Sequence, residues 1–476
     1  MDQTNSEDTG NFGRVLFYSL VAALGGFLFG FDSGVINGTV DALQQAFNSD
    51  AAGTGFNVAS MLLGCAAGAF FAGTLADKFG RKPVMIVTAA TFIISAWGSG
   101  ISTGSAMFVF FRITGGLAVG AASILAPAYI SEIAPAKIRG SLATLQQLMI
   151  VVGLFAAFLS NYMIAGAAGG ASDPFWGGFS AWQWMFWVEI LPSGLFLVCL
   201  FFIPESPRYL VASGRLGEAK QVIGQVAGTS GVDEKIEDIR STLDEDKKPR
   251  LSDIISTYTG KVHPIVWVGL GLAVLQQFTG INVVFYYGAT LWQAAGFTEE
   301  NALLQNVISG SVNVLFTFVA ILLVDKVGRK PLLMIGAVGQ GVMLGILALI
   351  FGTAGLSESG ALQLDGNMGL YALLAANGYI AFFAFSWGPI MWVMLGEMFP
   401  NRFRGSALAF CGLAQWLANF TITMTFPVFL ANIGLGFSYG IYAFFGFLAF
   451  YFVKRFVVET AGRTLEDISR EAEEIQ

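Results

Sequence analysis

The chain of 476 residues is 55% apolar and only 12% charged, and 44 of its residues are phenylalanine. This composition excludes an ordinary soluble protein of two or three domains. The net charge of −7 says little about function, because nearly all charged residues lie in the segments between apolar runs. Three cysteines (Cys65, Cys199 and Cys411) lie inside apolar runs, and their spacing predicts neither a disulfide framework nor a metal site.

Twelve apolar stretches of roughly 20 residues, each almost free of charge, follow one another from Val15 to Phe456. About 20 helical residues cross a hydrocarbon layer of ~30 Å. Residues 1–13 are polar and acidic, so we expect the first stretch to be a retained span and not a cleaved signal peptide. The sequence therefore predicts an all-α membrane protein with twelve transmembrane helices, at about 15–37, 56–76, 84–103, 107–130, 141–163, 183–203, 263–290, 303–324, 332–352, 369–397, 406–430 and 437–456.

The loops between these spans alternate in charge. Apart from Lys454 and Arg455 at the very end of the last span, only Arg112 of the 25 basic residues falls within a span, and every second loop contains no Lys or Arg at all. Because basic loops remain in the cytoplasm, both termini are expected there, in a plasma or inner membrane. The basic loops lie near 77–82, 137–139, 204–262, 325–331 and 400–404.

Two loop motifs occur twice. Asp77-Lys-Phe-Gly80-Arg81-Lys82-Pro83 after span 2 returns as Asp325-Lys-Val-Gly328-Arg329-Lys330-Pro331 after span 8. Glu132-Ile-Ala-Pro135-Ala-Lys-Ile-Arg139-Gly140 after span 4 returns as Glu397-Met-Phe-Pro400-Asn-Arg-Phe-Arg404-Gly405 after span 10. Two six-span halves in the same orientation are typical of transporters whose substrate site lies between the halves.

The repeat defines the expected organisation of the chain. The polar stretch between the halves contains amphipathic segments at about 215–226 and 233–243, which predict short helices. We expect a cytoplasmic N-terminus (1–14), a first half (15–203), a cytoplasmic linker (204–262), a second half (263–456) and a cytoplasmic tail (457–476).

These loops resemble those of the sugar porter family of the major facilitator superfamily, and the similarity covers nearly the whole chain. Further motifs typical of that family occur in the expected order: Pro204-Glu205-Ser206-Pro207-Arg208 after span 6, Gln276-Gln277-Phe-Thr-Gly280-Ile-Asn282 in span 7, Trp387-Gly388-Pro389 with Trp392 in span 10, and Gln415-Trp416 in span 11. The segment Val458-Glu459-Thr460-Ala461-Gly462 departs from the family pattern, which usually has Pro before Glu and Lys before Gly.

Acidic and basic residues gather at the cytoplasmic ends of the spans, where two halves must approach and separate. Ion pairs there can hold one state closed. The alternative is that the basic residues merely set the topology, but topology has little use for the acids. The resemblance implies that these residues form a cytoplasmic gate that stabilises the outward-open form: Asp77, Arg81, Glu132, Arg139, Glu205, Arg208, Asp325, Arg329, Glu397 and Arg404.

Away from the span ends, three charged residues lie inside spans: Asp32, Arg112 and Glu189. Such residues are costly in hydrocarbon and by default indicate function. The helical rise places all three at similar depth, so that Arg112 can offset one or both acids. The alternative is that Arg112 snorkels to the outer surface. The resemblance implies proton coupling, because the bacterial proton-coupled xylose symporter has the same three residue types at these places.

Several neutral amides lie within spans, where a sugar would need hydrogen-bond donors and acceptors. Gly280 can break span 7 so that Gln277 and Asn282 both point inward. Taken singly, any of these amides could instead join helices to one another. By resemblance, nine residues are expected to bind the sugar: Phe29, Gln147, Gln276, Gln277, Asn282, Asn313, Phe383, Trp392 and Gln415.

We therefore expect a monosaccharide transporter that works by alternating access, coupled to protons, and not an enzyme. By the same resemblance, aliphatic Leu154 favours a hexose such as glucose or galactose, with xylose as a second candidate. The expected partners are the sugar, the proton and the lipid bilayer, with no cofactor, metal, nucleic acid or obligate protein partner. The alternatives are a proton-independent sugar uniporter, a carrier of drugs or organic acids, and a transporter-like nutrient sensor.

Overall fold

The computed structural model describes residues 12–135, 139–228, 231–245, 254–255, 260–356, 362–364, 366–400 and 403–461. Nearly all of this part of the chain is helical. The first half comprises α1 (Phe12–Val35), η1 (Ile36–Gly38), α2 (Val40–Phe47), α3 (Ala51–Phe79), α4 (Arg81–Ile101), α5 (Ser105–Ile133), α6 (Arg139–Ala168), α7 (Ala181–Trp187) and α8 (Ile190–Leu200).

The second half has the corresponding helices, and three short helices join the halves. The linker helices are α9 (Pro207–Ala212), α10 (Leu216–Ala227) and α11 (Val232–Glu245), so both predicted amphipathic helices are confirmed. The second half comprises α12 (Pro264–Phe278), α13 (Ile281–Ala294), α14 (Glu299–Val327), α15 (Arg329–Thr353), α16 (Met368–Ala384), α17 (Trp387–Met398) and α18 (Arg404–Phe456). Strands β1 (Gly355–Leu356) and β2 (Leu362–Gln363) pair antiparallel, Gly355 with Gln363, beyond α15.

In the described part of the chain, eleven helical segments are long and apolar enough to cross a membrane. The last of them, α18, has 53 residues. It would extend about 80 Å if straight, far more than one crossing of ~30 Å requires. Non-helical torsion angles at Gly434 (φ 76°, ψ 174°) divide α18 into two spans. The prediction of twelve spans is therefore confirmed, whereas the loop expected at 431–436 is reduced to a kink.

Three spans are interrupted in the middle. The break between α12 and α13 falls at Gly280 (φ 82°, ψ 18°), as the sequence predicts. Two further breaks were not expected, one between α7 and α8 and one at Ser386 between α16 and α17. Pro389 explains the latter, because proline lacks an N–H and clashes with the preceding turn of a helix. Broken spans are typical of transporters, where they line the substrate path.

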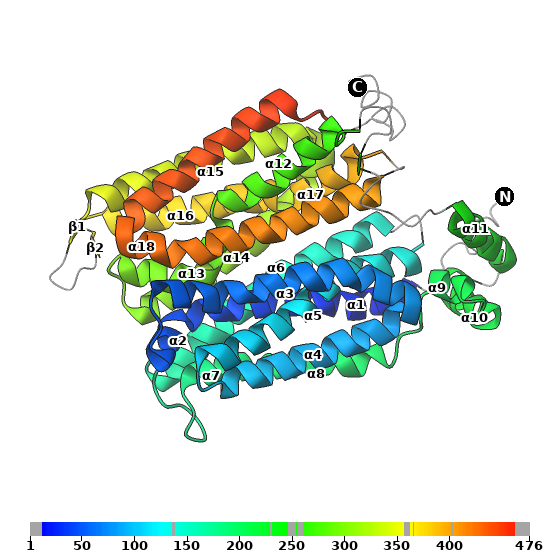
Figure 1. Cartoon of the computed structure of the whole chain (residues 1–476), viewed down its shortest axis with the longest axis horizontal. Coiled ribbons are helices and arrows are strands. Elements are labelled where there is room, and N and C mark those ends of the chain that lie inside the picture. Colours follow the sequence, from blue (N-terminus) through cyan, green and yellow to red (C-terminus); the bar gives the residue numbers. More distant parts are fainter. Residues whose placement is uncertain are drawn as a thin grey trace, which may run out of the picture.

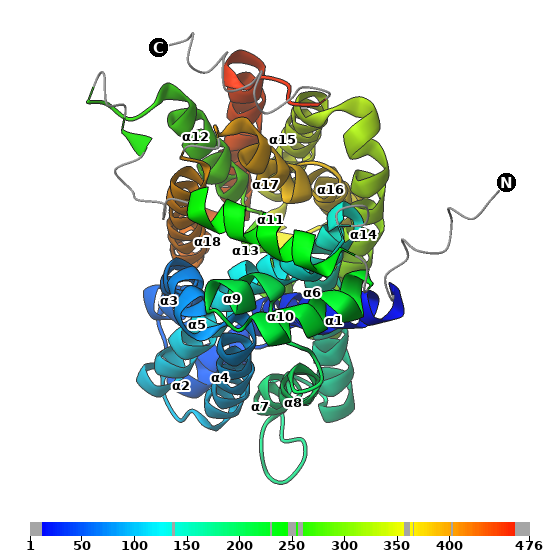
Figure 2. The same ribbon diagram turned by 90° about the vertical axis from the view of Figure 1, so that its right-hand side faces the viewer.

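The two halves form separate layers that lie side by side, as the two ribbon views show (Figure 1, Figure 2). They meet where α3 packs on α18 and where α6 packs on α14. Many large apolar side chains are exposed on the helices, including Leu191, Phe202 and Leu349. Such a surface is unstable in water and suits contact with lipid. The protein is a multi-pass membrane protein.

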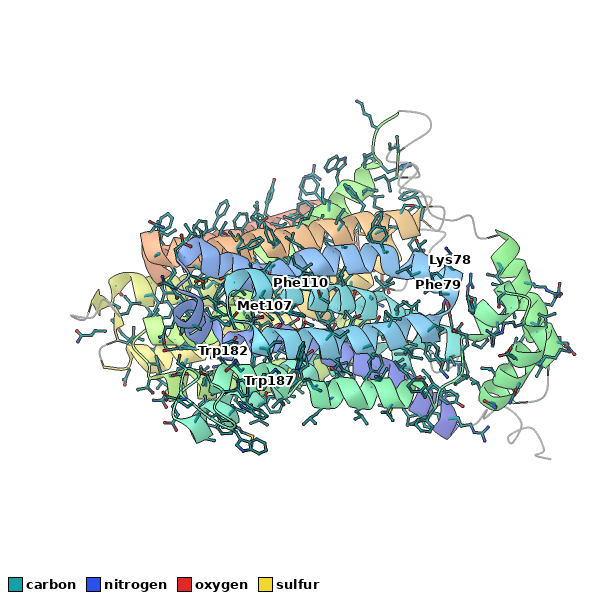
Figure 3. All side chains as sticks on the ribbon, turned by 60° about the horizontal axis from the view of Figure 1, so that its bottom comes forward. Lys78, Phe79, Met107, Phe110, Trp182 and Trp187 are labelled. Atoms are coloured by element: carbon teal, nitrogen blue, oxygen red, sulfur yellow. The ribbon has the colours of Figure 1, made fainter. Side chains whose placement is uncertain are left out.

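The two ends of the bundle differ. Helices α9 and α10 lie at one end, in front of the first half in Figure 2, and we call this the linker end. The opposite end, where α2, α7, β1 and β2 lie in Figure 1, is called the far end. Figure 3 shows Lys78 and Phe79 at the linker end, with Trp182 and Trp187 toward the far end.

Candidate functional site between the two halves

A connected group of amide side chains surrounds the break in span 7. The Asn282 amide donates to Gln277 Oε1 at 2.5 Å, and the Gln277 amide donates to Gln276 Oε1 at 3.0 Å. Residues 277 and 282 could not face each other on a regular helix. The left-handed conformation of Gly280 makes it possible, and a Cβ at that position would lie only 2.7 Å from the Tyr442 ring.

Gln276 joins this group to two other spans. Its Oε1 also accepts a hydrogen bond from Gln415 at 3.0 Å, and its Nε2 donates to the backbone oxygen of Trp387 at 2.8 Å. Gln276 and Gln277 are buried, with 3% and 2% exposure, and Gln415 with 9%. Four of the six predicted amides are therefore connected, drawn from α12, α13 and α18, and together they present donors and acceptors in one place.

The remaining predicted sugar contacts are distributed around this group. Phe29 of α1 packs on Trp416 of α18 with ring centroids 5.9 Å apart, so an aromatic pair crosses between the halves. Trp392 is 39% exposed, and its ring approaches Gly412 of α18. Phe383 lies beside Gly388 at the break in span 10.

Gln147 and Asn313 lie outside the connected amides. Gln147 is half-buried on α6, while the neighbouring Gln146 is buried against Gly26 of α1. Asn313 is buried on α14, and its backbone oxygen accepts a hydrogen bond from Thr317. Sugar binding by these two residues stays a prediction.

A buried ion pair joins Asp32 of α1 to Arg112 of α5. Arg112 Nη1 donates to Asp32 Oδ1, and Nη2 donates to the Asp32 backbone oxygen at 3.2 Å. Both residues are 1% exposed, so Arg112 does not snorkel to a surface. The guanidinium also lies over the ring of Phe186, 5.7 Å from its centroid. The sequence prediction that Arg112 offsets an intramembrane acid is confirmed for Asp32.

Glu189 belongs to the same buried group of charges. It is 1% exposed, lies at the break between α7 and α8, and interacts electrostatically with both Asp32 and Arg112. Among the described residues, Asp32 Oδ2 and Glu189 Oε2 are buried without a hydrogen-bond partner. Two acids and one base are thus enclosed together in the described part of the chain.

At the linker end of the first half, four charged residues form what we call the first clamp: Asp77, Arg81, Glu132 and Glu205. Arg81 bonds to Glu132 at 3.0 Å and to Asp77 at 3.0 Å. Glu205 accepts a hydrogen bond from the Arg81 backbone N–H at 3.0 Å. Gly80 (φ 102°) leaves room for this carboxylate, because a Cβ there would lie 2.3 Å from Glu205 Oε2.

The second half has a matching group, the second clamp, made of Asp325, Arg329, Glu397 and Glu459. Arg329 bonds to Glu397 at 2.9 Å and to Asp325 at 3.1 Å. Glu459 accepts from the Arg329 backbone N–H at 3.0 Å. Gly328 (φ 94°) leaves room for it, as Gly80 does in the first clamp.

Sequence reasoning did not predict Glu459 as a member of the second clamp. The hydroxyl group of Ser206 donates to Glu132, and the Thr460 hydroxyl donates to Glu397 at 2.6 Å. Glu205-Ser206 and Glu459-Thr460 are therefore equivalent parts of the repeat. The signal was present as a Glu-hydroxyl pair shortly after the sixth and the twelfth span.

Each clamp lies within one half, and none of the contacts described for the two clamps joins the halves. Arg404 donates to the backbone oxygen of Phe399 in its own half at 3.1 Å. Arg208 is the second residue of α9, and the side chain of Arg139 lies outside the described residues.

At the far end, by contrast, the halves are bonded to each other. Asp41 of α2 accepts hydrogen bonds from Thr290 at 2.9 Å and from Gln293 at 2.7 Å, both on α13. Glu299 of α14 accepts a hydrogen bond from the Ala171 backbone N–H at 2.8 Å. Burial, opposed by the hydrogen bonds from α13 and reinforced by nearby Glu299, raises the pKa of Asp41. The structure is closed at the far end.

Comparison with known proteins identifies the family. The family model described as sugar (and other) transporter matches residues 18–472. The chain is 52% identical to a glucose transport protein of Synechocystis, covering 97% of this chain and 98% of that one. It is 39% identical to the D-xylose-proton symporter of Escherichia coli, covering 96% of each.

Solved structures agree with this result. A partially occluded inward-open conformation of the Escherichia coli xylose transporter matches with a TM-score of 0.82 at 37% identity, covering 95% of this chain and 100% of that one. The proton:xylose symporter bound to 6-bromo-6-deoxy-D-glucose matches with a TM-score of 0.77 at the same identity, covering 97% and 99%. The chain therefore belongs to the sugar porter family of the major facilitator superfamily, and it is a sugar transporter.

Proposed function

We propose that this transporter takes up a hexose such as glucose together with a proton, across a plasma or inner membrane. The observation that carries this proposal is the coexistence of two sites: the connected amides around Gly280 and the buried charges Asp32, Arg112 and Glu189. The amides offer a polyol both donors and acceptors in a site removed from water. The buried charges offer a place for a proton.

Coupling would follow from the bond between Asp32 and Arg112. Protonation of Asp32 removes one charge of the pair and weakens its hold on the guanidinium, so that α1 and α5 can move relative to each other. Glu189, buried beside the pair, provides a second acidic group close to Arg112. Because none of the hydrogen bonds described here joins the pair to the connected amides, we expect that mutation can separate sugar binding from proton binding.

The proposed orientation places the linker end in the cytoplasm. The linker end carries Lys78, Lys82, Arg81 and Arg329, whereas the loops of the far end contain no Lys or Arg. The positive-inside rule then puts both termini in the cytoplasm. With the far end closed, this structure would correspond to an inward-facing state, in keeping with its likeness to an inward-open relative.

We assign the clamp residues, together with Arg139, Arg208 and Arg404, to a cytoplasmic gate. In the present structure the bonds of Arg81 and Arg329 stay within their own halves. Closure of the linker end would bring the two clamps together, where unlike charges can pair across the interface. This assignment predicts that the clamps favour the form that is open at the far end.

We propose that the preferred substrate is a hexose, with a pentose as the second candidate. The chain is 52% identical to a relative named for glucose and 39% identical to one named for xylose. Leu154 of span 5 is buried against Gly34 of α1. Its aliphatic side chain cannot form a hydrogen bond with a sugar. Phe29, Phe383 and Trp392 supply the aromatic surface that the C–H face of a sugar requires.

The test is uptake of radiolabelled sugars into proteoliposomes with and without an imposed proton gradient. We expect glucose to accumulate only with the gradient, and unlabelled galactose and xylose to compete for uptake. Uptake that is indifferent to the gradient would leave a sugar uniporter. Fructose competing better than glucose would overturn the proposed substrate.

A further inference from the structure

The guanidinium group of Arg112 divides its hydrogen bonds between Asp32 and a second side chain. Nη1 donates to Asp32 Oδ1, whereas Nη2 donates to the Asp32 backbone oxygen at 3.2 Å and to the sulfur of Met61 at 2.9 Å. A guanidinium can also bind a carboxylate through two parallel hydrogen bonds, which is the stronger arrangement. Here Nη2 is occupied by two uncharged acceptors, so the described contacts join Arg112 to the carboxylate through Nη1 alone.

Met61 is held beside Arg112 by the close packing of α3 on α5. A Cβ at Gly116 of α5 would lie only 2.0 Å from the Met61 backbone oxygen, and a Cβ at Gly64 of α3 would lie 2.1 Å from the Ile113 backbone oxygen. Met61 is 2% exposed. A buried methionine ordinarily fills space in a core, but its thioether sulfur is also a weak hydrogen-bond acceptor. The packing of the two backbones therefore presents this acceptor to the guanidinium.

We propose that Met61 is a positioning residue for proton coupling, because its sulfur occupies Nη2 of Arg112 and leaves the Asp32 carboxylate with a single bond to the guanidinium. This inference rests on the proposed function, since it assigns a role within the proposed coupling site. The thioether satisfies a buried N–H without adding a charge. A carboxylate that accepts one bond from the guanidinium is protonated more readily than one that accepts two, because each such bond favours the charged form.

Other titratable groups approach the pair from α3, from α13 and from the break between α7 and α8. Cys65 of α3 and Glu189 at the break interact electrostatically with both members of the pair, and Tyr286 of α13 interacts with Arg112. Glu189 is the second carboxylate that Nη2 would meet if the sulfur were removed. The experiment must therefore separate an effect on Asp32 from an effect on Glu189.

The experiment follows the protonation of Asp32 in the purified protein by infrared spectroscopy. The band of a protonated carboxyl group that is absent from Asp32→Asn reports on Asp32, and its pH titration requires neither a sugar nor a gradient. Met61→Leu nearly preserves the volume of the side chain but removes the acceptor, so we expect Nη2 to turn to Asp32 Oδ2. Half-protonation should then require a pH lower by about one unit, which is a tenfold higher proton concentration. Proton-driven uptake should shift to lower pH by the same amount.

Three further variants distinguish positioning from packing. Met61→Gln supplies an oxygen acceptor of similar reach, so half-protonation should stay at or above the native pH, whereas a site used only for apolar packing would tolerate Leu and be disturbed by Gln. Met85→Leu is the matched control, because Met85 of α4 is an equally buried methionine of the same half, and it should leave the titration unchanged. Met61→Leu combined with Glu189→Gln should still show the shift, because Nη2 turns to Asp32.

An unchanged titration in Met61→Leu would overturn the assignment, as would an equal shift in Met61→Gln or Met85→Leu, or loss of the shift in the presence of Glu189→Gln. An Asp32 band that does not titrate in the native protein would overturn it as well. If Met61→Gln does not fold, the comparison of Met61→Leu with Met85→Leu decides. Uptake that is indifferent to the proton gradient, together with a shifted band, would refute proton coupling but would support the effect of Met61 on Asp32, so the two failures are distinguishable.

Discussion

Glu205 accepts a hydrogen bond from the backbone N–H of Arg81 at 3.0 Å, although 124 positions separate the two residues. Glu459 has the same relation to Arg329, also at 3.0 Å, over 130 positions. The two carboxylates nevertheless differ in pKa. Burial raises the pKa of Glu205 despite three backbone hydrogen bonds, whereas four backbone hydrogen bonds outweigh burial and lower the pKa of Glu459.

These shifts predict opposite effects of pH on stability. The stabilisation by Glu459 is present above the ordinary carboxyl pKa of 4.5 and is lost as the pH falls through its lowered value. The contribution of Glu205 to stability is complete below pH 4.5 and is lost as the pH rises through the raised pKa of this carboxyl group. As the pH rises toward 4.5, we expect Glu459→Gln to become less stable relative to the native chain, because only the native chain gains the stabilisation by the carboxylate. Above pH 4.5, we expect Glu205→Gln to become more stable relative to the native chain, because only the native chain has to ionise a buried acid. Melting temperatures of the purified protein across this range provide the measurement, and a common trend in both variants would contradict the assignment.

Replacing the connected amides should weaken sugar binding. In Gln276→Ala, Gln277→Ala and Asn282→Ala, sugar hydroxyls lose partners in a site closed to water, at a cost of about 1 to 3 kcal/mol each. Gln276→Ala should have the largest effect, because Gln277 and Gln415 also lose their acceptor.

Calorimetric titration with glucose measures this effect. Gln305→Ala is a suitable control, since Gln305 is a buried amide that bonds within its own helix to Ser309 at 3.4 Å. Affinity unchanged in all three variants would remove span 7 from the sugar site.

Asp32→Asn should uncouple transport from the proton gradient. The amide imitates a permanently protonated acid, so gradient-driven accumulation should be lost while sugar binding and equilibrium exchange remain. Glu189→Gln should have a smaller effect, because Glu189 is not bonded directly to Arg112 in the contacts described here. Counterflow and accumulation measured in the same proteoliposomes separate the two activities. Accumulation by Asp32→Asn would show that the proton is carried elsewhere.

Gln340→Leu should stabilise the protein. Gln340 of α15 is 0% exposed, and within the described residues neither of its side-chain polar atoms has a hydrogen-bond partner. A buried polar group without a partner costs about 1 to 3 kcal/mol, and an apolar side chain of similar size avoids that cost. We expect a higher melting temperature with unchanged transport. A lower melting temperature would mean that the amide has a partner in another state of the cycle.

Local sequence signals predicted much of the fold. The lengths of the apolar runs gave all twelve spans, and Gly280 marked the break in span 7 because glycine tolerates the left-handed conformation found there. The depth of Asp32, Arg112 and Glu189 along their helices predicted that Arg112 can offset one or both acids, and the structure pairs it with Asp32. These predictions succeed because the regular geometry of a helix converts the spacing of residues along the chain into depth in the membrane, and because glycine marks a place where that geometry can end.

Features that depend on contact between distant segments escaped prediction. Asn37 looks like any small polar residue near the end of a span, and its hydrogen bonds to Phe285 and Ala289 of α13 appear only in the folded structure. Glu459 lies in a segment that was noted only because Val458 and Ala461 depart from the family pattern, although its carboxylate does what Glu205 does. The break at Ser386 lies within an apolar run, so hydropathy gave no indication of it.

The second clamp also sets a lower limit on the length of the chain. Glu459 and Thr460 follow the last residue of α18, Phe456, by only a few positions, and both bond to groups of the second half. A chain cut after Val458 would retain every span, but the backbone N–H of Arg329 would lose the Glu459 carboxylate that accepts its hydrogen bond. Tags and truncations at the C-terminus should therefore begin beyond Ala461, whose N–H still donates to Glu459 at 2.9 Å.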